Sequence, residues 1–387
     1  MGGAEMSEWP KVKLKELMVI KNGKDHKALL DGEYPVYGSG GIMRYVNKYL
    51  YDKESVLLPR KGTLNNIQFA TFPFWTVDTC YYTEVKNEKV LPYFLYLSIC
   101  QLDIAALNTG SAVPSMTFDK YYSIEINLPP LPVQRRIAEI LSRYDSLIEN
   151  YQRQIKLLEE AAQRLYKEWF VDLHFPGHEN TPIIDGIPEG WEKKKLGEVF
   201  TYVRGKSYTS KELSNKGTIM VNLKNIQAFG GYNRNAEKRF TGDYKEMQAL
   251  EKGDLIMGVT DMTKERRLVG HVALVPDFNE RATFSMDLIK IVPFELPKVY
   301  LYCAMRFGGI STSISPLANG VNVLHLKPDA LTGIEMIVPN KVLIQNFSSY
   351  ASSCIEEINN IEDQIRNLTE ARDRLLPKLM SGEIDIV

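Results

Sequence analysis

The stretch "LPPLPVQRRIAEILSRYDSLIENYQRQIKLLEEAAQRLYKEWF", residues 128–170, decides how this chain is built. A proline cluster ends at Pro132, and a charged segment follows in which apolar residues recur at alternating steps of three and four. That spacing is the a/d seam of a helix that pairs lengthwise with another helix. Pro132 suits the first turn of such a helix, where its missing N–H costs nothing. The narrow stripe favours a paired helix over the alternative, an ordinary long core helix.

The partner of this helix lies in the same chain. The C-terminal segment repeats the apolar stripe and an E-A-x-x-R-L pattern, which begins at Glu160 in the first copy and at Glu370 in the second. Arg372 is the one polar residue in the second stripe. We therefore predict an antiparallel pair of helices. The helix-pairing residues we expect are Ile148, Ile155, Leu158 and Leu165 in the first helix and Ile358, Ile365, Leu368 and Leu375 in the second.

The segments between the helices repeat as well. "WPKVKLKELMVIKNGK" starts at Trp9, and "WEKKKLGEVFTYVRGK" starts at Trp191. Further along, the pair Gly110 and Val113 recurs as Gly320 and Val323. The two halves thus resemble each other at their beginnings and ends but differ in between. A repeat of this size indicates internal duplication.

Each globular part is expected to be rich in β-strands. Short runs of β-branched and aromatic residues are cut by Gly, Pro, Asn and Asp in both halves. The predicted fold class is α+β, with two β-rich domains separated by two long helices that form an intramolecular antiparallel coiled coil with pseudo-twofold internal repeat. The predicted boundaries are 1–131 for the first domain, 132–173 for the central helix, 174–340 for a linker and the second domain, and 341–387 for the C-terminal helix.

Composition bounds the class of protein. The 387 residues are 44% hydrophobic and 25% charged, which is typical of a globular chain of two domains. The net charge of −1 gives none of the basic excess of a simple nucleic-acid binder, so any basic surface must be local or a partner must supply it. The four cysteines have no metal or disulfide spacing, and we find neither a signal peptide nor a membrane span, so we expect a cytoplasmic protein.

A search for catalytic machinery gives weak matches. "YGSGG" at 37–41 lacks the spacing of a nucleotide-binding loop. "NLPP" at 127–130 is followed by no aromatic residue and so resembles the amino-methyltransferase tetrapeptide only superficially. His174 and His178 are separated by Pro and Gly, so they do not share a helical face that could bind a metal. We predict no catalytic residue and no metal site in this chain.

The sequence offers more candidate residues for DNA binding than for catalysis. Several turns carry the Arg, Lys, Asn, Ser and Thr side chains that clamp phosphates and read base edges in DNA. Two such domains on a rigid rod suit a duplex with two separated half-sites. The alternative is an adaptor whose β-rich domains bind protein partners, and such an adaptor would show no sequence-dependent DNA binding. The predicted DNA-binding residues are Arg60, Lys61, Thr63, Asn65 and Ser111 in the first half and Arg204, Lys206, Ser207, Lys264, Arg266, Arg267 and Asn322 in the second.

Taken together, the chain resembles the specificity (S) subunit of type I restriction–modification systems. The resemblance covers nearly the whole sequence and rests mainly on "LPPLPVQRRIAEIL", "WPKVKLKEL", "IPEGWEKKKLGEV" and "ARDRLLPKLMSGEI". It implies two target recognition domains, each reading one half of a bipartite double-stranded DNA target, with the helix pair fixing the gap. It also implies that this chain holds no catalytic residue and no cofactor.

The partners follow from the same resemblance. A specificity subunit docks two methyltransferase (M) subunits, which use S-adenosylmethionine to methylate adenine N6, and a restriction (R) subunit that uses ATP and Mg can join them. One segment departs from the pattern: "VPNKVLIQNFSSYASS", from Val338, is a degenerate copy of the proline-rich helix start. If that edge docks the methyltransferase, the two docking faces are unequal.

Overall fold

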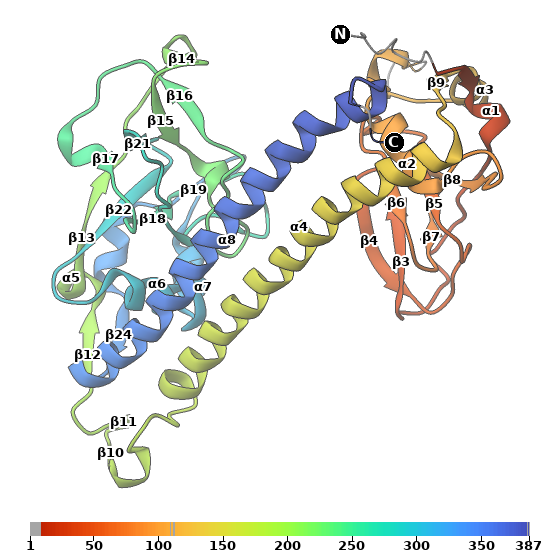
Figure 1. Ribbon diagram of the computed structural model, residues 1–387. Coiled ribbons are helices and arrows are strands. Elements are labelled where there is room, and N and C mark those ends of the chain that lie inside the picture. The colour runs from red at the N-terminus through yellow and green to blue at the C-terminus, as the bar shows by residue number, and fades with distance from the viewer. Residues whose placement is uncertain (1–8, 109, 111–112, 385, 387) are drawn as a thin grey trace. The chain divides into compact units, whose positions relative to one another are not determined.

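The computed structural model describes residues 9–108, 110, 113–384 and 386, and the chain divides into two compact units (Figure 1). One unit comprises Met1–Asn150 with Gln364–Val387, and the other comprises Tyr151–Asp363. Two long helices, α4 (Leu131–Tyr166) and α8 (Lys341–Ser381), contribute to both units. Each unit therefore contains a β-rich domain and a stretch of each long helix, which confirms the predicted α+β class.

The first unit packs a four-stranded sheet of order β2-β8-β5-β6 against a buried helix, α2, and the long helices. A three-stranded sheet of order β4-β3-β7 and a two-stranded ribbon of β1 and β9 complete its β-structure. Its elements are β1 (Lys11–Lys13), α1 (Leu14–Leu17), β2 (Met18–Lys21), β3 (Tyr34–Gly38), β4 (Gly41–Val46), β5 (Ser55–Pro59), β6 (Gln68–Ala70), β7 (Trp75–Thr76), β8 (Cys80–Val85), α2 (Pro92–Cys100), η1 (Ala105–Leu107), α3 (Phe118–Tyr122) and β9 (Glu125–Asn127).

The second unit has a four-stranded sheet of order β13-β22-β18-β20 and a five-stranded sheet of order β14-β16-β15-β21-β17. The pairs β12-β24, β19-β23 and β10-β11 form two-stranded ribbons. Its elements are β10 (Ile183–Ile184), β11 (Ile187–Pro188), β12 (Glu192–Lys195), α5 (Leu196–Val199), β13 (Phe200–Arg204), β14 (Leu213–Ser214), β15 (Thr218–Val221), η5 (Leu223–Asn225), β16 (Lys238–Phe240), β17 (Ala249–Leu250), β18 (Leu255–Gly258), β19 (Thr260–Asp261), β20 (Val272–Leu274), β21 (Ala282–Phe284), β22 (Leu288–Pro293), α6 (Lys298–Phe307), α7 (Ile310–Ile314), β23 (Leu324–His325), η8 (Pro328–Gly333) and β24 (Glu335–Val338), besides the short turns η3 (His178–Asn180), η4 (Ser210–Glu212), η6 (Glu246–Gln248) and η7 (Ser315–Leu317).

Both domains are built on one frame. Each begins with a short strand that pairs antiparallel with the strand preceding a long helix, as β1 does with β9 and β12 does with β24. The backbone N–H of Leu14 donates to the Ile124 carbonyl at 2.9 Å, and that of Leu196 donates to the Ile334 carbonyl at 2.8 Å. The four-stranded sheets follow the same order. The repeat seen in the sequence is therefore a repeat of local structure.

Helix α4 ends in a cluster of aromatic side chains near the start of α8. Helix α4 stops at Tyr166, and one π-helical turn, Lys167–Val171, follows it. The turn places the rings of Trp169 and Phe170 against Phe347 of α8, with ring centroids 6.4 and 5.2 Å away. Because the two compact units cut both helices, they do not test the predicted domain boundaries, which stay predictions.

Inside the second unit the helices run antiparallel. Tyr166, the last residue of α4, packs on Phe347 near the start of α8, while Ile155 and Ile358 line one cavity further along (Figure 1). All eight predicted pairing residues are half-buried. Their individual pairings stay a prediction.

The predicted linker contains a hairpin. Strands β10 and β11 are joined by Asp185 and Gly186, whose φ angles are 50° and 79°. Two consecutive positive φ angles define the type I′ turn that an Asp-Gly pair favours.

Among the described residues, no helix combines the length and the apolar composition that a membrane crossing would need.

Candidate nucleic-acid interface

In the first domain, the predicted loop after β5 lies beside the predicted loop before α3. Lys61 forms a bridge with Ser115, and the N–H of Gly62 donates to the carbonyl of Pro114 at 3.0 Å. The guanidinium of Arg60 lies 5.9 Å from the centroid of the Tyr81 ring, and its backbone carbonyl accepts from Met116. We call residues 60–66 and 113–116 the first loop pair. Its exposed cation is Lys61, and Arg60 is half-buried.

The second domain has a loop pair in the same place. Residues 261–269, after β18, lie beside residues 318–325, because Asp261 is paired with Leu324 and the Arg266 guanidinium donates to the Ala318 carbonyl at 3.5 Å. This second loop pair carries Lys264, Arg266 and Arg267. Arg266 has a φ of 54°, a left-handed conformation that non-glycine residues rarely adopt and that clusters at functional sites.

A buried carboxylate shapes the 261–269 loop. One oxygen of Asp261 accepts from the N–H and the hydroxyl of Thr263, both at 2.7 Å, and the other accepts from the N–H groups of Leu268 and Val269 at 2.6 and 3.0 Å. Burial works to raise the pKa of Asp261, but these donors lower it below its usual value overall. An ionised Asp261 therefore holds the loop that presents the cationic side chains.

In each domain, a glycine at matching positions of the sequence repeat lies close to a valine carbonyl of the loop pair. A Cβ on Gly110 would lie 2.1 Å from the carbonyl oxygen of Val113, and a Cβ on Gly320 would lie 1.9 Å from that of Val323. Only glycine fits at either position. The repeated Gly and Val in the sequence therefore mark the same close approach of a glycine to a valine carbonyl in both domains.

A third segment approaches each loop pair, and the sequence prediction used only one of the two copies. The N–H of Lys206 donates to the Phe284 carbonyl at 2.7 Å, and in the turn after β21 the Asp287 carbonyl accepts from Val259 at 2.8 Å, two residues before the second loop pair. In the first domain, the N–H of Lys24 donates to the Thr76 carbonyl at 2.8 Å, and the Thr79 carbonyl, three residues later, accepts from Arg60 at 2.8 Å and Lys61 at 3.3 Å. Lys24 is exposed and is the counterpart of Lys206 in the repeated "NGK" and "RGK", so the sequence repeat already contained the signal that would have found it.

The remaining predicted residues differ in their surroundings. Asn65 is already engaged: its amide donates to Asp103 at 3.1 Å and accepts from the Ala105 N–H at 2.7 Å. Arg204 stacks 5.9 Å from the Tyr202 ring and lies 3.9 Å from Asp329. Ser111 lies outside the described residues. The exposed members of the set are Lys61, Thr63, Asn65, Arg204, Ser207, Lys264, Arg267 and Asn322.

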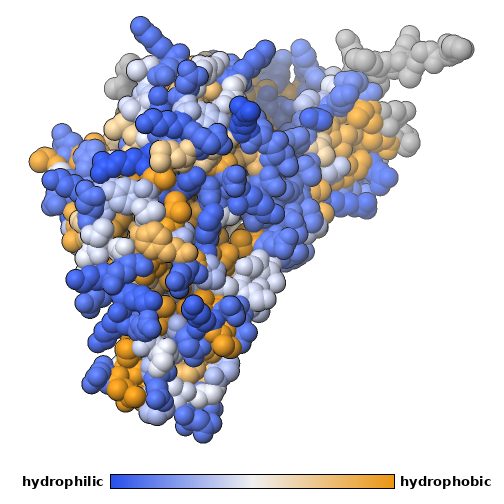
Figure 2. Space-filling view, turned by 90° about the vertical axis from the view of Figure 1, so that its left-hand side faces the viewer, coloured by the Kyte–Doolittle hydropathy of each residue, from blue (hydrophilic) through white to orange (hydrophobic). Residues whose placement is uncertain are grey.

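The second loop pair also presents apolar side chains that the prediction missed. Met262 is 78% exposed and Val321 is 100% exposed. On the face shown in Figure 2, hydrophilic residues predominate and apolar ones lie in small groups. Apolar side chains on DNA-reading loops can contact the methyl group of thymine.

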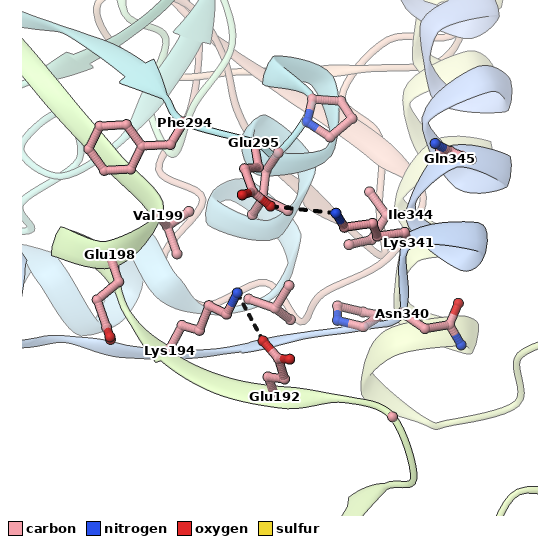
Figure 3. Close-up of a pocket in the computed structure, with 15 residues that line it drawn as sticks. Glu192, Lys194, Glu198, Val199, Phe294, Glu295, Asn340, Lys341, Ile344 and Gln345 are labelled. Carbon is pink, nitrogen blue, oxygen red and sulfur yellow. Dashed lines mark ion pairs between the residues drawn. The ribbon is translucent and has the colours of Figure 1, made fainter.

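A hollow of about 990 Å³ lies elsewhere in the second unit, at the start of α8 (Figure 3). Each of its two lysines pairs with a carboxylate: Lys194 with Glu192 at 2.9 Å and Lys341 with Glu295 at 3.7 Å. It therefore offers no local cationic surplus for a phosphate backbone, and we do not assign it to DNA.

The start of α4 differs from that of α8. The side chain of Gln134 accepts from the Leu91 N–H at 2.9 Å and donates to the Pro129 carbonyl at 2.8 Å. The sequence repeat puts Ile344, a lining residue of the hollow, in place of Gln134. An isoleucine cannot form these hydrogen bonds. The degenerate sequence segment thus corresponds to a structural difference between the two helix starts.

Among the described residues, no group of three or more His, Cys, Asp or Glu side chains is arranged to hold a metal ion.

These observations define a class of protein: a duplicated β-rich domain, each copy presenting three converging loop segments and each followed by a long helix. The chain matches the type I restriction modification DNA specificity domain twice, over residues 6–160 and 188–367. It belongs to that family.

Individual proteins similar to this chain are also described as type I specificity subunits. The chain is 28% identical over 352 residues to the type I restriction enzyme MjaIX specificity subunit of Methanocaldococcus jannaschii, covering 87% of this chain and 79% of the relative. It is 23% identical over 408 residues to the MjaVIII specificity subunit of the same organism, covering 98% and 93%. The crystal structure of a type I restriction-modification S subunit from M. genitalium superposes with a TM-score of 0.62 at 17% identity, over 98% of this chain and 97% of that one, a likeness of fold.

Proposed function

We propose that this chain is the DNA specificity subunit of a type I restriction–modification complex, in which each domain reads one half of a bipartite target. The observation that carries the proposal is the repeated convergence of three loop segments on the same frame. A protein with two equivalent reading surfaces suits a target with two half-sites. The loops that read DNA in this proposal are the two loop pairs.

The proposed roles of the residues follow from their surroundings. Exposed Lys24, Lys61, Lys264 and Arg267 contact phosphates, and half-buried Arg60 and Arg266, held by their neighbours, reach base edges. A bidentate arginine–guanine contact contributes about 1–3 kcal/mol of discrimination. Because the net charge is only −1, DNA affinity in the complex depends partly on a partner.

The chemistry belongs to partners in this proposal. The chain docks two methyltransferase subunits through the region of its long helices, and those subunits bind S-adenosylmethionine and methylate adenine N6. A restriction subunit, where present, supplies the site for ATP and Mg. The chain itself contributes positioning and no catalytic group, and it works with DNA in the cytoplasm.

A methylation map tests the proposal. The chain is expressed with the methyltransferase subunit of its own system, and host DNA is sequenced for N6-methyladenine, with the methyltransferase alone as control. We expect a bipartite motif with one methylated adenine on each strand, present only with this chain. A pair that co-purifies but adds no motif would instead favour an adaptor that binds proteins.

A further inference from the structure

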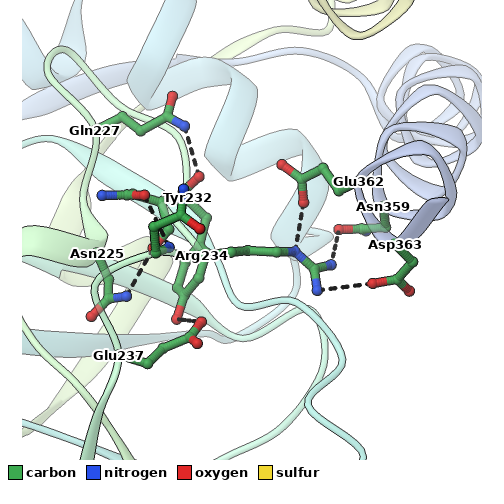
Figure 4. A network of polar contacts seen from close by, with 10 residues as sticks. Asn225, Gln227, Tyr232, Arg234, Glu237, Asn359, Glu362 and Asp363 are labelled. Carbon is green, nitrogen blue, oxygen red and sulfur yellow. Dashed lines mark hydrogen bonds and ion pairs between the residues drawn. The ribbon is translucent and has the colours of Figure 1, made fainter. Parts of the chain in front are cut away.

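An arginine of the second domain reaches across to helix α8 within the same unit. Arg234 lies in the loop between η5 and β16, and its guanidinium donates to Glu362 at 2.7 Å, to Asp363 at 3.1 Å and to Asn359 at 3.5 Å (Figure 4). These partners occupy one face of the helix, since they are one, three and four residues apart. All three contacts would be lost if the domain shifted along the helix by a few ångströms.

A second arginine reaches the other helix. Arg306, on α6, donates to Glu159 of α4 at 3.0 Å and to the Tyr302 hydroxyl at 2.6 Å. Its guanidinium also lies 5.7 and 5.3 Å from the ring centroids of Tyr302 and Phe307. The second domain therefore places one largely buried arginine against each long helix, Arg234 on two carboxylates of α8 and Arg306 on one of α4.

Both arginine side chains are only 15% exposed, so their charges are largely shielded from water. The loop that carries Arg234 is itself braced, because the Asn225 amide donates to the Asn233 carbonyl at 2.8 Å. A cavity of about 130 Å³, lined by apolar side chains as well as by Glu159, Arg306 and Glu362, lies at the same joint. Apolar side chains of both helices also pack on the domain at this joint, and the two arginines add directional contacts to that packing.

The two arginines are better suited to orienting the second domain than to stabilising it. A shielded ion pair often adds little net stability compared with apolar residues of similar size, whereas a planar guanidinium fixes direction well. We propose that Arg234 and Arg306 form an orientation clamp that sets the angle of the second domain on the helices and thereby the gap between half-sites that the complex accepts. The inference rests on the proposed function and adds that gap selection has determinants outside the DNA-reading loops.

The test measures gap discrimination. Purified complexes of this chain with its methyltransferase subunit are offered duplexes carrying the mapped target with its own gap or with one base pair more or fewer. For Arg234→Met we expect the preference for the native gap to fall about tenfold, which corresponds to ~1.4 kcal/mol, while the half-site bases stay unchanged. Arg281→Met, a change of an exposed arginine in the same domain, serves as the matched control and should keep the preference.

Loss of folding is separated from loss of orientation by a double variant. Arg234→Met with Glu362→Leu leaves no uncompensated carboxylate at position 362, so its melting temperature should return toward that of the wild type. Its gap preference should stay relaxed. Wild-type gap preference in a folded double variant would overturn the clamp, whereas a wild-type complex that methylates no bipartite target would overturn the proposed function instead.

Discussion

At the scale of the residue, Asp261 combines burial with four hydrogen-bond donors, and this makes a pH-dependent prediction. Its pKa is lower in the folded chain than in the unfolded one, so its contribution to stability is present above the unfolded value of about 3.9 and is lost as pH falls through the folded value. Asp261→Asn should cost about 1–3 kcal/mol at neutral pH.

Urea unfolding at a series of pH values checks this. The difference in free energy of unfolding between wild type and Asp261→Asn should shrink as the pH drops below 4. Asp277→Asn is the matched control, because Asp277 is exposed and accepts one backbone hydrogen bond, from Asn279 at 2.9 Å. A pH-independent difference for the Asp261 variant would contradict the role of its ionised carboxylate.

A second residue-scale prediction concerns Lys24, whose place matches that of Lys206. If both contact phosphates, Lys24→Ala and Lys206→Ala should each weaken DNA binding by the complex about equally for all sequences and lower the salt slope by about one. Binding isotherms at several salt concentrations measure this. Lys211→Ala, at an exposed lysine of the second domain, is the control. An unchanged slope for both variants would remove these lysines from the interface.

At the scale of the element, the polar residue in the second apolar stripe has a partner. Arg372 of α8 donates to Asp145 of α4 at 2.7 Å, and Asp145 also accepts from the Tyr93 hydroxyl of α2. The contact joins both helices and the first domain inside one unit. Burial and the hydrogen bond to Asp145 raise the pKa of Tyr93, so its hydroxyl stays protonated and donates.

Removing one partner should cost more than removing both. Arg372→Leu leaves Asp145 without its cation and should lower the free energy of unfolding by about 1–3 kcal/mol. Asp145→Asn can still accept from Tyr93, so the double variant should recover part of that loss. A double-mutant cycle by thermal unfolding measures the coupling, and additive losses would show that the pair does not interact.

Sequence reasoning succeeds where spacing carries the signal. The alternating steps of three and four predicted both long helices, and the repeated Gly110 and Gly320 marked the same close approach to a valine carbonyl in two domains. It fails where contacts join residues with no regular spacing: Arg372 stood out in the stripe, but nothing in the sequence pointed to Asp145. Arg234 and Asp261 were missed for the same reason, although the Asp-x-Thr turn beginning at Asp261 is a known loop signal. The loop cations stay predictions, because exposed side chains leave no packing pattern in the sequence.

At the scale of the whole molecule, the helix pair is expected to act as a ruler. Inserting one heptad into each long helix adds ~10.5 Å of helix, and at ~3.4 Å per base pair the accepted gap should lengthen by about 3 bp. Methylation mapping of the lengthened complex measures the new gap. An insertion of the same length in the hairpin turn at Asp185 and Gly186 is the control and should leave the gap unchanged. An unaltered gap in the helix variant would refute the ruler.

The ribbon that opens each domain has a genetic consequence. In the first domain the chain enters at Pro10 and leaves at Leu128, and the N–H of Leu128 donates to the carbonyl of Pro10 at 2.9 Å. The two ends of the first domain therefore lie side by side, and the second domain has the same strand pairing at its ends. The first domain can thus be exchanged as one piece. Recombination between genes at these two points would exchange residues 10–128 as one piece and leave both helices intact. New target specificities could therefore arise in a single step, without any change in the sequence of the two long helices.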